Sequence, residues 1–187
     1  MRNESVALEE FEEKINHVNE HPGFTISRAC ALISTEFPFL AASLDAIFTC
    51  PCYGNGVIEV KCPFKFKNVT ITTAAQTKGF PFIYSEEKNS YSMDKDHAYY
   101  FQVQPQLFIA GYRFAYFVVY TTLDMVYVTV PYDADLLSVS IPQAKKNVLE
   151  VIMPEVLGGY FYLKSAMRNN VPQNSLENKY LLPKRIT

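Results

Sequence analysis

The sequence predicts a single α/β domain with a small mixed β-sheet flanked by helices. The chain has 187 residues, of which 49% are hydrophobic and 14% are aromatic, and this is enough to build one well-packed core. Residues 4–19 carry apolar side chains at helical spacing, whereas residues 57–60 and 114–130 are rich in the β-branched and aromatic residues that favour strands.

The charge balance does not identify a partner. There are 17 Lys and Arg against 19 Asp and Glu, a formal net charge of −2. Domains that bind nucleic acid are usually basic, so the balance counts mildly against DNA. A local positive groove beside an acidic metal site is still compatible with it.

No apolar run is long enough to span a bilayer, and the segment Met1-Arg2-Asn3-Glu4 is not a secretory signal. We therefore expect no membrane association and an intracellular protein, nuclear in a eukaryote and cytoplasmic otherwise. The four cysteines, Cys30, Cys50, Cys52 and Cys62, are then expected to be reduced thiols. An alternative is that Cys50, Cys52 and Cys62 hold structural zinc in an interaction module, although their spacing is weak for a metal site.

The stretch from Leu40 to Pro63 predicts two short strands joined by a turn. The turn residues, Tyr53-Gly54-Asn55-Gly56, tolerate positive φ and favour a tight hairpin. Such a hairpin returns Glu59 beside Asp45. Glu59 and Lys61 are two residues apart on a strand, so their side chains point to one face.

This arrangement suits phosphodiester hydrolysis. Two carboxylates a few ångströms apart repel one another unless a cation lies between them. Mg²⁺ prefers oxygen ligands and is usually held by one or two carboxylates with substrate phosphate. Lys61 could hold or deprotonate the attacking water. The alternative is that the E-x-K tripeptide forms only a solvated ion pair on an edge strand.

Asp45 followed by Glu59-Val60-Lys61-Cys62-Pro63 resembles the D…E-x-K core of the PD-(D/E)XK nucleases, and specifically the YqaJ-type viral recombinases, a family that includes lambda exonuclease. The resemblance implies a restriction-endonuclease-like core, with Mg²⁺ or Mn²⁺ held by Asp45, Glu59 and the Val60 carbonyl. It also implies a DNA nuclease of viral or mobile-element type, with 5′ to 3′ exonuclease action on duplex ends in recombination. A homo-oligomer is left open.

Two further segments carry the resemblance. Residues 3–11 resemble a family helix whose acidic residue faces the active site, which adds Glu4 to the catalytic candidates. Residues 99–107 resemble the family segment Y-Y-x-Q-V-Q-x-Q-L, in which a glutamine lies near the catalytic lysine. We expect Gln102 in that role, ahead of Gln104 and then Gln106. Candidate substrate-binding residues are Ser43, Lys65, Lys67, Gln104 and Gln106.

The chain departs from the family pattern at several points. Leu44 replaces a proline and Ala46 a glycine, and an Ala at positive φ would strain the backbone by roughly 1 kcal/mol. Pro105 should bend the glutamine helix, and the basic segment R-x-x-x-I-T-A-S is absent upstream of Glu4. The alternative reading is an inactive, mobile-element-derived domain that binds DNA or a protein partner.

The rest of the chain gives a simpler pattern. Residues 24–33 carry strand residues, residues 68–78 are ambiguous, and residues 80–95 predict a loop with one short strand. Asp94 or Asp96 is expected to cap the glutamine helix. Two strands follow over residues 114–130, and then a helix over residues 133–157, whose expected buried face comprises Ala144, Val148, Leu149, Ile152 and Val156. The nuclease domain is expected to span residues 1–163, with a polar tail from residue 164.

Overall fold

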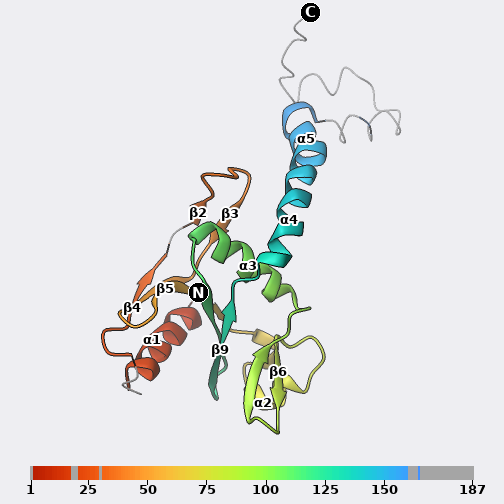
Figure 1. The fold of residues 1–187 in the computed structure, drawn as a ribbon. Coiled ribbons are helices and arrows are strands. Elements are labelled where there is room, and N and C mark those ends of the chain that lie inside the picture. Colours follow the sequence, from red (N-terminus) through yellow and green to blue (C-terminus); the bar gives the residue numbers. More distant parts are fainter. Residues whose placement is uncertain (1, 18–20, 30, 160–163, 165–187) are drawn as a thin grey trace, which may run out of the picture. The chain divides into compact units, whose positions relative to one another are not determined.

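The computed structural model describes residues 2–17, 21–29, 31–159 and 164. The chain divides into two compact units, residues 1–137 and residues 138–187. The first unit is built on a five-stranded sheet in the order β1-β4-β5-β8-β9 (Figure 1). Its strands are β1 Thr25–Arg28, β4 Ala46–Cys50, β5 Gly54–Lys61, β8 Phe114–Tyr120 and β9 Met125–Pro131. Only β5 and β8 run parallel, so the expected mixed sheet of an α/β fold is confirmed.

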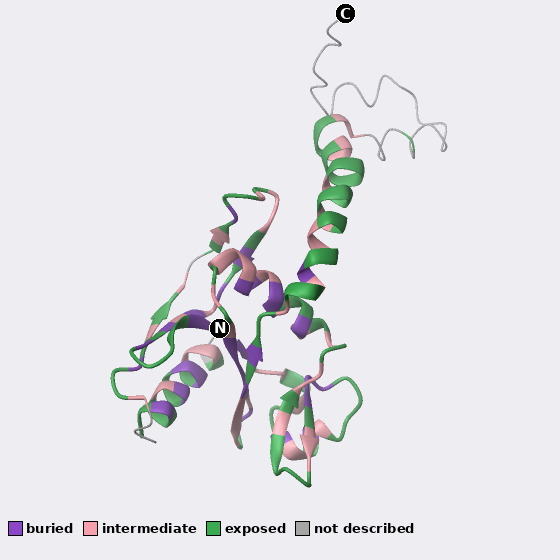
Figure 2. Ribbon diagram, in the orientation of Figure 1, coloured by how far each residue is buried: buried purple, intermediate pink, exposed green. Residues whose placement is uncertain are grey.

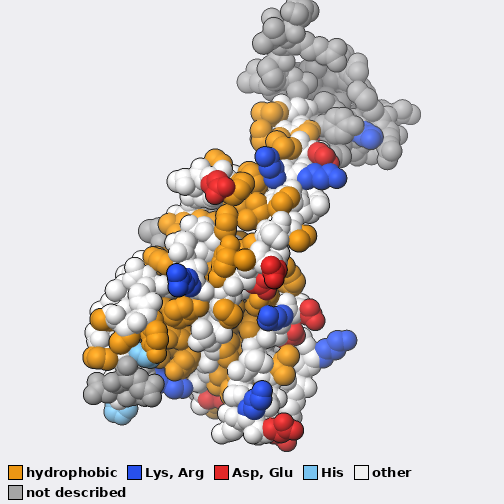
Figure 3. Space-filling view, in the orientation of Figure 1, with side chains coloured by type: hydrophobic (Ala, Val, Ile, Leu, Met, Phe, Trp, Pro, Cys, Tyr) orange, Lys and Arg blue, Asp and Glu red, His pale blue; other side chains and the backbone are white. Residues whose placement is uncertain are grey.

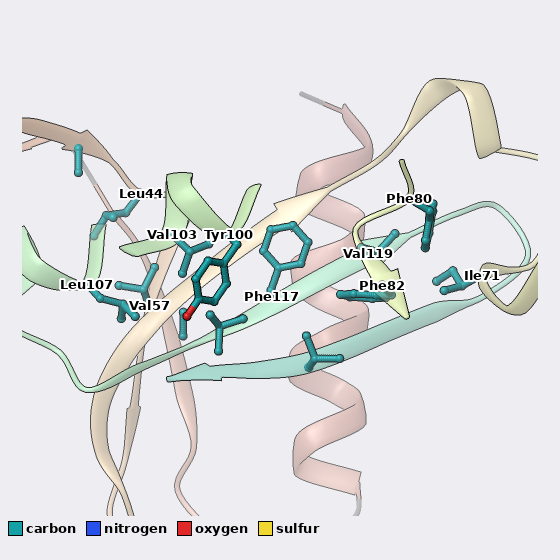
Figure 4. Packing of buried hydrophobic residues seen from close by; sticks show 14 of the residues in the cluster. Leu44, Val57, Ile71, Phe80, Phe82, Tyr100, Val103, Leu107, Phe117 and Val119 are labelled. Carbon is teal, nitrogen blue, oxygen red and sulfur yellow. The ribbon is translucent and has the colours of Figure 1, made fainter. Parts of the chain in front are cut away.

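Helices cover both faces of this sheet. Because successive residues of a strand point to opposite faces, Val57 of β5 joins one buried cluster with Val103 and Leu107 of α3, Ala98–Ala110 (Figure 4). Its neighbour Ile58 joins the other cluster, with Phe11 of α1, Arg2–His17. In Figure 2, buried stretches of the ribbon lie on α1, on α3 and on the strands between them. The central strand β5 is therefore buried on both sides.

The glutamine helix α3 has defined ends. The side chain of His97 accepts a hydrogen bond from Tyr99 N and caps the first turn, so the expectation of Asp94 or Asp96 as the cap was wrong. Gly111 ends the helix at a φ of 71°, which favours glycine. The helix continues through Pro105.

Small elements surround the sheet. The strands β2, Ala31–Ile33, and β3, Ala41–Ser43, form one hairpin. A 3-10 turn η1, Phe64–Phe66, and a short helix α2, Ile71–Ala75, follow β5. The strands β6, Phe82–Ser85, and β7, Ser90–Met93, form a second hairpin, so residues 80–95 hold two strands where one was expected.

The last described elements are helical. They are α4 Ala134–Asn147, the π-helical turn η2 Val148–Ile152, and α5 Met153–Gly158. The helix is confirmed, but its expected buried face was wrong, because Leu149, Ile152 and Val156 are 58%, 51% and 73% exposed. Figure 3 shows hydrophobic side chains on the surface of this segment. Helical spacing groups residues on one face but does not supply a surface that covers it.

The predicted polar tail lies outside the described residues apart from Lys164, and the domain boundary at residue 163 stays a prediction. Within the described part of the chain, no helix is both long and apolar enough to cross a membrane.

Candidate active site

Asp45 lies between β3 and β4, at the point where the chain enters the central sheet. The register pairs Ala46 of β4 with Ile58 of β5, which brings Asp45 beside the second half of β5. Its Oδ2 accepts a 2.8 Å hydrogen bond from Val60 N. The hairpin therefore returns Glu59 beside Asp45 as expected. Its turn was wrongly placed, because the turn covers residues 51–53, whereas Gly54, Asn55 and Gly56 belong to β5 and pair with β4.

Glu59 points from β5 toward α3 and is 1% exposed. Its Oε1 accepts hydrogen bonds from Lys61 Nζ and, at 2.6 Å, from Gln102 Nε2. Its Oε2 accepts a 2.8 Å hydrogen bond from Gln106 Nε2. A buried carboxylate is costly unless it is paired and hydrogen-bonded, and here three donors hold it in one orientation.

The three glutamines of α3 differ in their hydrogen-bond partners. Gln102 and Gln106 are four residues apart, so they lie on one helix face, and both reach Glu59. Gln106 also donates a 3.0 Å hydrogen bond to the Ser43 carbonyl. Gln104 points elsewhere, because its amide bonds the Pro131 carbonyl and Asp133 N. The structure therefore brings Gln102 and Gln106 to the carboxylate and leaves Gln104 outside the site.

Lys61 is held between a carboxylate and an aromatic ring. Its ammonium pairs with Glu59 and lies 5.1 Å from the centroid of the Tyr99 ring, a cation–π geometry in which the ring attracts the ammonium. Tyr99 was not expected in the site. Its position in the sequence could have indicated this role, because Tyr99 lies three residues before Gln102 and therefore on the same face of α3.

Beside this lysine the surface is hollowed. A pocket of about 380 Å³ is lined by Asn3, Glu4, Val60, Lys61, Cys62, Pro63 and Tyr99. Glu4, in the first turn of α1, therefore borders the same space as Lys61 although 57 residues separate them in the sequence. Glu4 is the catalytic candidate furthest from Lys61 along the chain, and the fold brings the two to one pocket.

The charges of the site interact. Burial raises the pKa of Glu59, and the nearby charge of Asp45 acts in the same direction, whereas Lys61 opposes the shift. Burial also raises the pKa of the Cys62 thiol, and the negative charges of Glu4 and Asp45 add to it. These effects place Asp45, Glu59 and Glu4 within electrostatic range of one pocket, where a cation would be favoured.

The donor set fits a hard divalent ion. Asp45 and Glu59 offer carboxylate oxygens and Val60 a backbone carbonyl, and all three are oxygen ligands of the kind Mg²⁺ prefers. Beside Glu59, the Oε1 atom of Gln106 is buried without a hydrogen-bond partner among the described residues. An unpaired acceptor on the amide that contacts the Glu59 carboxylate is an electron-rich surrounding that suits a cation.

The remaining candidates lie on the surface around this cluster. Ser43 is exposed and uses its carbonyl to hold Gln106. The exposed Lys65 and Lys67 follow β5 directly, and their ammonium groups lie 5.2 Å and 4.4 Å from the ring centroids of Phe66 and Phe64. Neither lysine contacts the carboxylates of Asp45 and Glu59. Only a ligand that extends beyond the carboxylate cluster would contact these lysines as well.

The departures from the family pattern leave the geometry intact. Leu44 is buried in the core cluster of the α3 face. Ala46 is the first residue of β4, and among the described residues the only non-glycine with positive φ is Asn89, so the expected strain at Ala46 is absent. Pro105 does not prevent Gln102 from reaching Glu59.

Cys62 lies with the active-site pocket, at the opposite end of β5 from Cys50, which pairs with Gly54. A zinc site built from Cys50, Cys52 and Cys62 was therefore a wrong expectation, because the length of the strand separates its members.

Comparison with known proteins identifies the family of this domain. The family profile of the YqaJ-like viral recombinase domain matches residues 1–113, the segment that holds Glu4, Asp45, Glu59, Lys61 and Gln102. The chain belongs to this family. No curated protein matches the chain significantly.

Solved structures agree on the fold of this YqaJ-like domain. The alkaline exonuclease LHK-Exo from Laribacter hongkongensis has a TM-score of 0.52 and 19% identity, and the match covers 86% of this chain and 71% of the exonuclease. A second structure of that enzyme, in complex with dAMP, matches to the same degree. The restriction-endonuclease-like fold expected from the D…E-x-K motif is thereby confirmed.

Proposed function

We propose that this domain is a metal-dependent DNA nuclease that degrades duplex ends from 5′ to 3′ in recombination. The observation that carries the proposal is the carboxylate–lysine cluster, Asp45, Glu59 and Lys61, which converges at the end of β5 beside a pocket. Membership of the YqaJ-like family and the likeness in fold to an alkaline exonuclease support it.

Asp45, Glu59 and the Val60 carbonyl would hold Mg²⁺, or Mn²⁺ in its place. When bound, the ion supplies positive charge that stabilises the negative charge developing on the phosphoryl oxygens. Val60 N orients Asp45 through its 2.8 Å hydrogen bond. Gln102 and Gln106 hold the carboxylate of Glu59 from the α3 side, so the ligands are pre-oriented before substrate arrives.

Lys61 would position the attacking water. Its ammonium is a hydrogen-bond donor on a flexible stem, and Tyr99 restricts where that stem can go. Glu4 borders the same pocket, and its carboxylate would accept a hydrogen bond from the water. The pocket would thus orient the nucleophile toward the scissile phosphodiester.

DNA contact would extend beyond the cluster. The exposed Lys65 and Lys67 follow the pocket-lining Pro63 and would neutralise backbone phosphates. The neighbouring Phe64 is 79% exposed and offers a ring on which a base at the frayed end could stack. The dAMP complex of LHK-Exo shows a deoxynucleotide bound to that enzyme and supports a nucleotide ligand for this domain.

The proposal is tested by comparing substrates of different topology. Linear duplex DNA labelled at the 5′ or the 3′ end and covalently closed circular DNA are incubated with the protein and Mg²⁺ or Mn²⁺. We expect degradation of linear DNA alone, with early release of the 5′ label. Cleavage of circular DNA would contradict exonuclease action, and binding without cleavage of any substrate would support the inactive, DNA-binding alternative.

A further inference from the structure

A second cluster of metal-binding side chains lies away from the active site. His21, Cys50 and Cys52 each place one ligand atom within 4.8 Å of the other two. We refer to these residues as the thiol–imidazole group. It lies at the start of β5, where Cys50 pairs with Gly54, whereas Glu59 is five residues further along the strand. At the rise of an extended strand, this separates the two clusters by about 16 Å.

We propose that the thiol–imidazole group binds a zinc ion that ties the segment between α1 and β1 to the β4–β5 turn. This site is independent of the proposed nuclease function, since it shares no residue with the carboxylate–lysine cluster. It is also a different group from the three-cysteine set expected from the sequence, because His21 takes the place of Cys62.

Strand pairing brings the three residues together. Antiparallel pairing of β1 and β4 sets Thr25 opposite Thr49, so the chain just before β1 lies beside the chain just after β4. His21 is four residues before Thr25, and Cys50 follows Thr49 directly. His21 and Cys50 are 29 positions apart in the sequence. The pairing of β1 with β4 brings them together in space.

Backbone packing fixes the approach. Gly23 adopts a φ of +82°, and a Cβ placed on it would lie 3.2 Å from Cγ of Pro51. Pro51 is the residue between the two cysteines. Only glycine combines this φ with so close a contact, so the His21 segment lies directly against the turn that carries both thiols.

The imidazole is oriented but lacks a partner. The ring of Tyr53 packs against the ring of His21, with centroids 4.8 Å apart at 64°. The Nδ1 atom of His21 is buried and has no hydrogen-bond partner among the described residues. A buried imidazole nitrogen without a partner is destabilising, and a cation bound to its lone pair would remove that cost.

The chemistry of the donors selects the ion. Two thiols and one imidazole suit zinc, which is bound by cysteine sulfur at about 2.3 Å and histidine nitrogen at about 2.0 Å. Hard ions such as Mg²⁺ prefer oxygen ligands. A tetrahedral site needs the sulfur atoms about 3.8 Å apart, and the two sulfur atoms already lie within 4.8 Å of each other. The exposed Cys52 opens the fourth position to water.

The experiment measures metal content on the full chain purified under reducing conditions without chelator. We expect one zinc per chain by elemental mass spectrometry. The variants Cys52→Ser and His21→Ala should lose it. Two matched variants should keep it: Cys62→Ser removes a cysteine outside the group, and Asp45→Asn removes a carboxylate of the other cluster.

Cobalt substitution tests the metal site in the wild-type chain, without any amino-acid substitution. Co²⁺ added to the zinc-free wild-type chain should give a thiolate-to-cobalt charge-transfer band and the intense visible bands of tetrahedral coordination, with zinc displacing them. Circular dichroism checks that each variant is folded. Zinc below one-tenth per chain with no charge-transfer band would overturn the proposal, as would a Cys50–Cys52 disulfide in the intact mass or zinc retained by both Cys52→Ser and His21→Ala.

Discussion

The side-chain amide of Gln106 donates a 2.8 Å hydrogen bond to Oε2 of Glu59, and both residues are almost fully buried. The same amide nitrogen bonds the Ser43 carbonyl, two residues before Asp45. One glutamine thus links α3 to both carboxylate-bearing segments. Gln102, one turn earlier on the same helix face and itself exposed, contacts the same carboxylate.

Replacing either of these two glutamines should lower the stability of the protein, but to different extents. Gln106→Ala removes the donor to Oε2 of the buried Glu59 and to the Ser43 carbonyl, so we expect a loss of about 1–3 kcal/mol in the free energy of unfolding. Gln102→Ala exposes its partner to water, and we expect a loss of no more than about 1 kcal/mol. Urea denaturation measures both. Equal losses in the two variants would contradict the assignment of Gln106 as the buried link.

Gly56 should tolerate no side chain. A Cβ there would lie 2.4 Å from Cε1 of Phe48 and 2.8 Å from the Phe114 carbonyl oxygen, so strands β4 and β8 would have to shift. We expect Gly56→Ala to lower the free energy of unfolding by about 1–3 kcal/mol. Gly158→Ala is the matched control, because no atom of the described residues beyond its own helix and chain neighbours lies within 4 Å of a Cβ placed there, and it should change stability by less than about 0.5 kcal/mol.

The hydroxyl of Tyr100 should make stability sensitive to alkali. Burial and the 2.7 Å hydrogen bond to Asp133 raise the pKa of Tyr100 to about 12. The unfolded chain loses the proton from about pH 10, so this contribution to stability is complete below pH 10 and is lost as the pH rises through 12. Tyr100→Phe should therefore reduce stability at pH 7, by about 1 kcal/mol, and flatten the decline above pH 10.

Urea unfolding at pH 7 and at pH 11 checks this prediction. Tyr84→Phe is the control, since it removes a hydroxyl hydrogen bond to Asn89 in the β6–β7 hairpin, outside the five-stranded sheet. A decline between the two pH values as steep in Tyr100→Phe as in the wild-type chain would show that Tyr100 is not the titrating group.

Lys65 and Lys67 should contribute to DNA affinity without affecting the fold. If each neutralises one phosphate, removing either should reduce the slope of log affinity against log salt by about 1, independently of sequence. Fluorescence anisotropy with a short duplex in Ca²⁺ measures the slope. Lys88→Ala, an exposed lysine in the β6–β7 turn, is the control, and an equal change in that variant would count against a specific contact.

Those parts of the candidate site that depend on local spacing could be predicted from the sequence. The E-x-K spacing places Glu59 and Lys61 on one face of β5, and the strand–turn–strand pattern predicts the hairpin that returns Glu59 to Asp45, although its turn lies at residues 51–53 and not at the expected residues 53–56. Both follow from strand geometry. Gln106 was ranked below Gln104, although four-residue spacing from Gln102 puts it on the active face.

Other features depend on contacts between distant segments. The meeting of His21 with Cys50 requires the pairing of β1 and β4, which no local pattern encodes. Tyr99 joins the site because α3 crosses β5 at Lys61. The exposed apolar residues Leu149 and Val156 repeat at helical spacing, and that spacing alone does not say whether a partner surface covers them.

The most direct test of the central account measures nucleotide release from end-labelled linear duplex DNA over time in Mg²⁺. It compares the wild-type chain with Asp45→Asn, Lys61→Ala and the control Lys88→Ala. The account predicts metal-dependent release by the wild type and Lys88→Ala, and at least a hundredfold slower release by the other two, as expected when a general acid–base or electrostatic group is removed. Folded Asp45→Asn and Lys61→Ala proteins that release nucleotides as fast as the wild type would contradict it.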